Sequence, residues 1–189
     1  MAADFAAARL NMVESQVRTN DVTDVRIHDA MRAIPREQFA PSKAYQAYTD
    51  ADLEYAPGRF LLRPREVSKL LQALKPMPGE RALAIAAPYA AAVLEAMGLT
   101  VERLDDAGLT PGPGANYDLI VVEGAVTKAP TAWTAALGQG GRLGVIELEG
   151  VNGKAAMYDR AHDGVGRRTL FDGMAPVLEG FEPQHGFAF

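Results

Sequence analysis

The segment RALAIAAPYAAAVLEAM (residues 81–97) decides the fold of this chain. Residues 81–86 form a short apolar run that predicts a buried strand, and residues 89–97 form an alanine-rich stretch that predicts a helix. Between them, Pro88 stands where the first turn of a helix tolerates proline. A strand that leads at once into a helix is typical of a parallel sheet with right-handed crossovers.

The same alternation continues towards the C-terminus. Further strands are predicted at residues 99–104, 117–122 and 142–148, a helix at 130–137 closed by the glycines of 138–141, and a loop rich in Gly, Pro and Asp at 105–116. The unbroken apolar run YDLIVV (residues 117–122) indicates a strand buried on both faces. Residues 155–160 and 167–171 flank HDGVG (residues 162–166), which predicts an antiparallel hairpin.

The N-terminal part of the chain is predicted to contain helices and a loop instead of alternating strands and helices. Helices are predicted at residues 4–18, at 25–34 after a cap in 21–24, and at 64–74. Residues 39–64 are rich in aromatic residues and proline and have no clear period, which fits a functional loop or a packed surface strap. We therefore expect a single domain over residues 1–189, with a helical and strap region (1–75) and a Rossmann-like core (76–189).

The amino-acid composition argues against several kinds of partner and site. The net charge of −5 argues against a nucleic-acid partner. The chain has no cysteine, which excludes disulfides and a thiolate nucleophile and suits a cytoplasmic location. We expect no signal peptide and no membrane span, because no apolar run is long enough. His28, His162 and His185 show no metal-ligand spacing, so we expect no metal site.

Several motifs are specific to a known family. They are MVESQVR (residues 12–18), AMRAIPREQFAP (30–41), AYTD (47–50), PGER (78–81), YDLIVV (117–122) and GGRL (140–143). On these motifs the chain resembles the protein-L-isoaspartate O-methyltransferases. The resemblance implies a Rossmann-like S-adenosylmethionine-dependent methyltransferase fold. It also implies S-adenosylmethionine as cofactor and methylation of the side-chain carboxylate of isoaspartyl residues in damaged proteins.

The cofactor loop departs from the family pattern. The family's first strand ends in GxGxG, where glycine lets the backbone turn tightly and approach the ligand. Here Ile85 is followed by Ala86, Ala87, Pro88 and Tyr89, and the loop is about two residues shorter by motif spacing. By resemblance Ala86, Ala87 and Tyr89 are the candidate cofactor contacts. The alternative is an ordinary strand-to-helix turn, with Tyr89 as a packing residue.

The substrate strap departs as well. The family's GxTISQP aligns with residues 58–64, and its two hydroxyl positions are Phe60 and Leu62, which cannot donate a hydrogen bond. Gly58 matches the glycine that begins the family's motif, and Arg59 and Arg63 could attract a carboxylate. The alternative is that both arginines are solvated and the apolar residues between them pack.

The third departure is a shortening. Between the second strand and residue 117 the family has a further helix and strand, and both are missing here. The second strand thereby becomes a sheet edge. Glu102 stands where the family's ribose-binding acid would be, and Glu123 follows the strand at 117–122, at the edge where such sheets carry sites. The alternative for each is a solvated carboxylate.

Three hypotheses follow from these departures. The first is a family member with degraded motifs that is weakly active or non-catalytic and acts by binding. The second is an active S-adenosylmethionine-dependent enzyme that methylates isoaspartyl carboxylates through a rearranged site. The third is a structural or oligomeric protein whose exposed second strand pairs with a protein partner or with itself.

Overall fold

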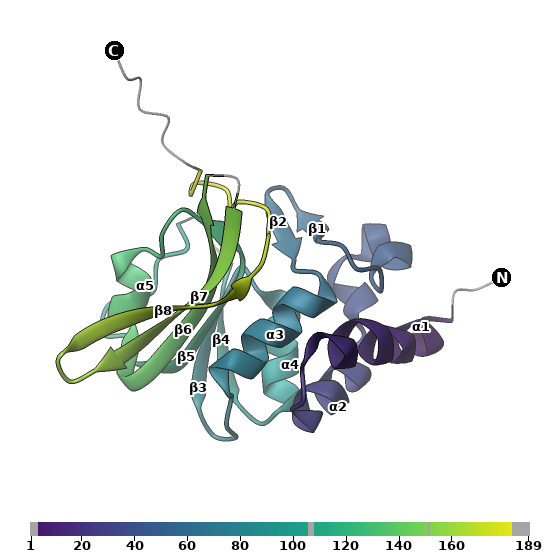
Figure 1. The fold of residues 1–189 in the computed structure, drawn as a ribbon, viewed down its shortest axis with the longest axis horizontal. Coiled ribbons are helices and arrows are strands. Elements are labelled where there is room, and N and C mark those ends of the chain that lie inside the picture. Colours follow the sequence, from purple (N-terminus) through teal and green to yellow (C-terminus); the bar gives the residue numbers. More distant parts are fainter. Residues whose placement is uncertain (1–3, 106–107, 151, 183–189) are drawn as a thin grey trace, which may run out of the picture.

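A sheet forms the centre of the computed structural model, which describes residues 4–105, 108–150 and 152–182 (Figure 1). Within these residues its six strands lie in the order β4-β3-β5-β6-β7-β8. Their bounds are β3 Arg81–Ile85, β4 Thr100–Leu104, β5 Tyr117–Val126, β6 Leu137–Glu149, β7 Asn152–Ala161 and β8 Gly164–Asp172. The pairs from β4 to β6 are parallel, and β6-β7 and β7-β8 are antiparallel. The predicted mixed sheet with its antiparallel C-terminal strands is confirmed.

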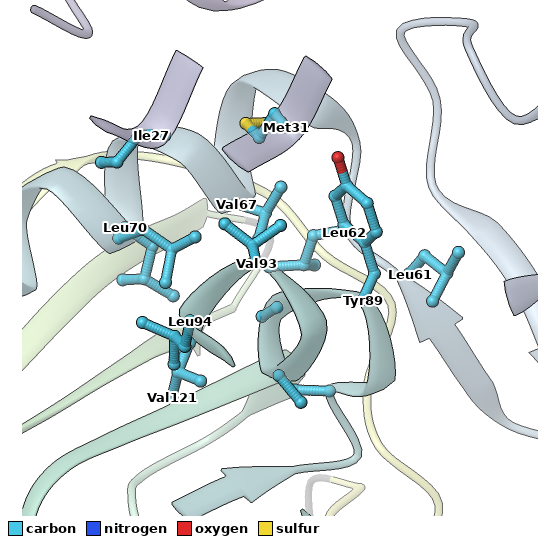
Figure 2. Close-up of a cluster of buried hydrophobic side chains, with 14 of the residues drawn as sticks. Ile27, Met31, Leu61, Leu62, Val67, Leu70, Tyr89, Val93, Leu94 and Val121 are labelled. Carbon is cyan, nitrogen blue, oxygen red and sulfur yellow. The ribbon is translucent and has the colours of Figure 1, made fainter. Parts of the chain in front are cut away.

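Helices cover both faces of the sheet. The helices are α1 Phe5–Met12, α2 Val25–Ala33, α3 Pro64–Leu74, α4 Pro88–Ala96 and α5 Thr131–Ala135. One hydrophobic cluster joins α1 to α4 with one face of the sheet, so the N-terminal region and the core share it. Figure 2 shows part of this cluster, where Leu70, Val93 and Val121 from three elements gather. A second cluster, which includes Trp133 of α5, covers the other face.

Alternation along β5 explains why both faces are covered. Leu119 and Val121 point into the first cluster, while Ile120 and Val122 point into the second. All four side chains are fully buried, as the unbroken apolar run predicts. The strand continues to Val126, beyond the predicted end, and its register shifts between Val121 and Ala125. This irregularity lies at the carboxyl edge of the sheet.

The structure corrects several predicted boundaries. Residues 138–141 do not close a helix but lie inside β6, at an irregularity between Leu137 and Arg142, which both pair with β5. The first helix continues as a π turn over Val13–Val17 and a 3₁₀ turn over Arg18–Asn20. The strap contains the short hairpin β1 Leu53–Ala56 and β2 Arg59–Leu61, preceded by 3₁₀ turns at Arg36–Phe39 and Pro41–Gln46. Strands this short contain too few residues to give a periodic pattern of apolar side chains in the sequence.

β4 is an edge strand, as the missing helix-strand unit implies. It pairs only with β3 among the described strands, and Thr100, Glu102 and Arg103 are exposed. The strand is short and carries charges, two features that discourage unwanted edge pairing. Elsewhere in the described part of the chain, no helix has the length and apolar character needed to cross a bilayer.

Arg142 ties the base of the sheet to the end of α3. Its guanidinium donates to the carbonyl oxygens of Leu74 (2.6 Å), Lys75 (2.8 Å) and Asp118 (2.9 Å). Both terminal nitrogens also pair with the carboxylate of Glu80, at 2.7 and 2.9 Å. One side chain therefore satisfies two carbonyls that the helix end leaves open and neutralises a half-buried acid.

Replacing Arg142 by methionine is expected to lower the free energy of unfolding by about 2 to 3 kcal/mol, because several charge-assisted hydrogen bonds are lost together. Urea denaturation measures the change. The matched control is Arg103→Met, which removes the exposed ion pair with Glu95 and should cost less than about 1 kcal/mol. Equal losses in the two variants would contradict this view of Arg142.

Candidate ligand site at the carboxyl edge of the sheet

The turn between β3 and α4 contains only Ala86 and Ala87. Ala86 adopts the left-handed conformation with φ of 47°, which an L residue rarely does, and its N–H donates to the carbonyl of Leu104 at 2.9 Å. Pro88 starts α4, so the strand passes into the helix through these two residues alone. Both alanines are buried. Their methyl groups fill space where a glycine loop would leave room for a ligand.

Ala86 of this turn shares a hydrophobic cluster with side chains from three other segments of the chain. Ala86, Leu109, Trp133 and Leu178 belong to one hydrophobic cluster, and each is at most 1% exposed. The indole nitrogen of Trp133 donates to the carbonyl of Leu109 at 2.6 Å, which holds the loop after β4 against α5. Asp106 of this loop lies outside the described residues. The carboxyl edge therefore has an apolar filling.

The C-terminal segment (residues 174–182) supplies part of this filling. The N–H of Ala125 donates to the carbonyl of Pro176 at 2.8 Å, and the N–H of Leu178 donates to the carbonyl of Ala125 at 2.9 Å. Leu178 rests against Gly124, where an added Cβ would lie 2.5 Å from the leucine side chain. The ring of Phe181 packs on Trp133 with centroids 5.3 Å apart. The segment thus continues the sheet at the end of β5.

Tyr89 points away from this edge. Figure 2 shows its side chain extending from α4 towards the N-terminal helices, beside Leu62. The ring packs edge-on against Phe39 with centroids 5.7 Å apart, and the Arg36 guanidinium lies 4.7 Å from the ring centroid. Tyr89 is fully buried, and burial raises the pKa of its phenol. In this structure it packs between the core and the N-terminal region.

Glu123 is buried, so the expectation of a solvated carboxylate is wrong. Its carboxylate accepts hydrogen bonds from the N–H of Leu62 in the strap and from the N–H of Ala90 in α4, both at 2.7 Å. Burial raises the pKa of Glu123 to about 7, although Arg36 and the two backbone bonds oppose the shift. The acid joins three separate elements: β5, α4 and the strap.

Arg36 is the counterpart of Glu123. Its side chain is fully buried and donates to the carbonyl oxygens of Ala47 (2.9 Å) and Leu62 (2.7 Å). Burial lowers the pKa of Arg36, and the nearby Tyr89 and Glu123 oppose that shift. The backbone of Leu62 is therefore held on both sides, since its carbonyl accepts from Arg36 and its N–H donates to Glu123. Sequence reasoning missed this role, although Arg36 lies inside the family signature.

The strap residues take structural positions. Leu62 is fully buried and Phe60 is half-buried, so the family's two hydroxyl positions hold packing side chains. Arg59 is buried, and Arg63 pairs with Asp52 at 2.7 Å, so neither arginine is simply solvated. Gly58 forms the hairpin turn with φ of 65°; an added Cβ there would lie 3.0 Å from Glu179 of the C-terminal segment.

Glu102 lies apart from the other candidates. It is exposed on the edge strand β4, as a solvated carboxylate would be. The pKa of the Tyr117 phenol is raised to about 12. Burial is the main cause, and the hydrogen bond with the Glu102 carboxylate is the second. No cluster of three metal-ligating side chains occurs in the described ranges, and His185 lies outside them.

These residues do not fit S-adenosylmethionine in the family's manner. The turn lacks glycine, Pro88 has no N–H, and the N–H of Ala90 is taken by the side chain of Glu123. Ala86 of the turn is buried in the same hydrophobic cluster as Leu109 and Leu178.

Comparisons with known proteins agree on one family. A model described as protein-L-isoaspartate(D-aspartate) O-methyltransferase (PCMT) matches residues 8–104. A relative from Methylorubrum extorquens with the name protein-L-isoaspartate O-methyltransferase is 37% identical over 168 residues, which is 74% of each chain. Another with this name, from Koribacter versatilis, is 29% identical over 95% of each chain.

Solved structures show the same fold. A structure titled protein-L-isoaspartate O-methyltransferase superposes with a TM-score of 0.68 at 18% identity, covering 91% of this chain and 66% of the other. A beta-aspartate methyltransferase structure from Plasmodium falciparum, in complex with S-adenosyl-L-homocysteine, gives a TM-score of 0.74 at 15% identity and covers 90% and 98%. At these identities the likeness concerns the fold alone.

Proposed function

Because the chain belongs to the protein-L-isoaspartate O-methyltransferase family, we propose that it is a member that has kept the methyltransferase fold, lost productive use of S-adenosylmethionine, and acts by binding another protein. The observation that carries this proposal is the apolar filling of the carboxyl edge by Leu109, Trp133 and Leu178. A ligand site needs a concave volume with converging polar groups, and the described residues of this edge contribute buried apolar side chains instead.

The strap also supports the loss of catalysis. Methyl transfer to a carboxylate depends on holding the nucleophile and the donor in line. The strap positions that would orient a carboxylate through hydroxyls are Phe60 and Leu62, and Leu62 is locked into the core by its hydrogen bond to Glu123. Substrate orientation and donor binding are therefore affected together.

The retained N-terminal signature has a structural explanation. Arg36 of this signature holds the strap through the carbonyl of Leu62 and balances the charge of Glu123. A residue that supports the core is retained whether or not the chain catalyses a reaction. The signature alone thus does not favour the second candidate, an active S-adenosylmethionine-dependent methyltransferase of isoaspartyl carboxylates.

Calorimetric titration tests the loss of cofactor binding. With S-adenosylmethionine and S-adenosylhomocysteine we expect no binding tighter than a Kd of about 1 mM. The relative from Methylorubrum extorquens serves as the comparison protein under the same conditions. Micromolar binding of either nucleoside by this chain would overturn the proposal, and a methyl-transfer assay on an isoaspartyl peptide would then show whether the bound donor is used.

The exposed edge of β4 is one place where a partner strand can add. If β4 of two copies paired antiparallel along its whole length, Glu102 of one copy would lie opposite Glu102 of the other. Like charges in that position repel. A different protein is therefore a better partner for this edge than a second copy. The cysteine-free composition fits such a role in the cytoplasm. We expect sedimentation to show a monomer; a stable dimer would favour self-pairing.

A further inference from the structure

The C-terminal segment occupies a groove as a bound peptide would. The groove is formed by the backbone of Gly124 and Ala125 at the end of β5 and by the indole of Trp133; we call it the edge groove. The segment enters it in extended form, with Val177 opposite Ala125 in parallel pairing. Ala125 exchanges two backbone hydrogen bonds with the segment, at 2.8 and 2.9 Å. Addition of an extended chain to a strand is a recurring mode of peptide recognition.

Two apolar side chains anchor the segment. Leu178 is fully buried against Gly124, whose missing Cβ makes the room. Phe181 packs on Trp133, and a turn brings it there, because its N–H donates to the carbonyl of Leu178 at 3.0 Å. Between the anchors, Glu179 and Gly180 are exposed. The spacing of leucine and phenylalanine thus matches two adjacent sites in the edge groove.

We propose that the edge groove is a recognition site for an extended peptide of a partner protein that carries leucine and phenylalanine three residues apart, and that residues 175–181 occupy it in cis. The backbone of Ala125 supplies affinity without regard to sequence, and the two anchor sites supply specificity. This inference deepens the proposed function, since it names the chemistry of the partner and rests on the edge not being used for a nucleoside.

Because the chain's own C-terminal segment fills the edge groove, a partner peptide has to compete with it. A tethered segment has an effective concentration of about millimolar, so a free peptide binds weakly while the segment is seated. Besides the two anchors, Ala175 of the segment is buried in the first cluster, while Met174 is 45% exposed and Glu179 lies beside Gly58. Weakening the two anchors should therefore release residues 176–181 from the edge groove, while the six strands of the described sheet, none of which includes this segment, keep their pairing.

The experiment uses the full chain with Leu178→Ala and Phe181→Ala combined. The probe is a synthetic peptide of residues 174–182, and the matched peptide has alanine at both anchor positions. Trp133 is the one tryptophan of the sequence, so its emission reports occupation of the groove directly. The control protein is Glu179→Ala, which keeps both anchors.

We expect the double variant to bind the unmodified peptide at least about tenfold more tightly than the wild-type and Glu179→Ala proteins do, with recovery of wild-type Trp133 emission. The alanine peptide should not bind. Equal binding of both peptides, or no binding by a folded double variant, would overturn the proposal, as would a dimer that exchanges segments between two copies. If the double variant does not fold, Phe181→Ala alone, which keeps buried Leu178, should show the same ranking at smaller amplitude.

The nucleoside titration and the peptide titration test different claims, so each can contradict its own claim without affecting the other. Binding of S-adenosylmethionine by the wild-type chain would overturn the proposed function while leaving the peptide result in place. Failure of the peptide to bind the double variant would overturn the edge groove as a docking site and leave the loss of cofactor binding standing.

Discussion

Replacing Arg36 by methionine is expected to lower the free energy of unfolding by about 3 to 5 kcal/mol, the largest stability change we predict. The methionine fills a similar volume but makes no hydrogen bond. It leaves the carbonyls of Ala47 and Leu62 without their donor and leaves Glu123 buried without its cation. The strap loses one of the two groups that hold Leu62 in place. Chemical denaturation at neutral pH, followed by circular dichroism, measures the loss.

The matched control for this prediction is Arg26→Met. Arg26 is an exposed helical arginine that pairs with Asp24 at 2.6 Å on the surface. Its replacement should change stability by less than about 1 kcal/mol. If the Arg36 variant unfolds at the same denaturant concentration as the Arg26 variant, the buried arginine does not support the strap in the way described.

The second large effect is a dependence on pH that Glu123 introduces. Because burial raises the pKa of Glu123 to about 7, the folded chain holds this proton more tightly than the unfolded chain, where a glutamate titrates near 4.3. Its contribution to stability is therefore fully present below about pH 4.3 and is lost as the pH rises through about 7. A glutamine at this position cannot ionise and does not undergo this loss.

The comparison that isolates this effect is Glu123→Gln against the wild-type chain from pH 4.5 to pH 8. We expect the stability of the glutamine variant to rise relative to the wild type by about 3 kcal/mol over this range. Glu80 and Glu147, whose pKa values are lowered, give the opposite slope, but they are present in both proteins and cancel. A difference that stays constant with pH would mean that Glu123 does not titrate in this window.

The fold could be predicted well because its signals are local. A strand such as β5 reads as an unbroken apolar run, and a helix such as α3 begins at a proline, so short windows of sequence contain the information. The predictions that were wrong concern irregular or very short elements. The glycines of residues 138–141 suggested a stop, but Leu137 and Arg142 on either side of them pair with β5, so the segment lies within β6, and no local pattern encodes that pairing.

The candidate site could be predicted only in part, and Glu123 shows why. Its place at the end of a strand follows from the sequence, but its burial depends on the strap, about sixty residues earlier, which covers it through Leu62. Arg36 is a second example, since a lone arginine in a helical region gives no sign that a distant loop encloses it. Burial of a charge is a property of non-local packing.

The sequence by itself determined that this chain has the methyltransferase-like sheet, that its first strand runs into a helix without glycine, and that β4 becomes an edge. The run from strand to helix follows from residue type and spacing, which act over a few residues, whereas the methyltransferase-like sheet and the edge position of β4 are what the family resemblance implies. Only the tertiary structure decided what takes the place of the missing features. Leu109 and Leu178 come from segments far apart in the chain, and both are buried in the second cluster because their apolar surface is removed from water there.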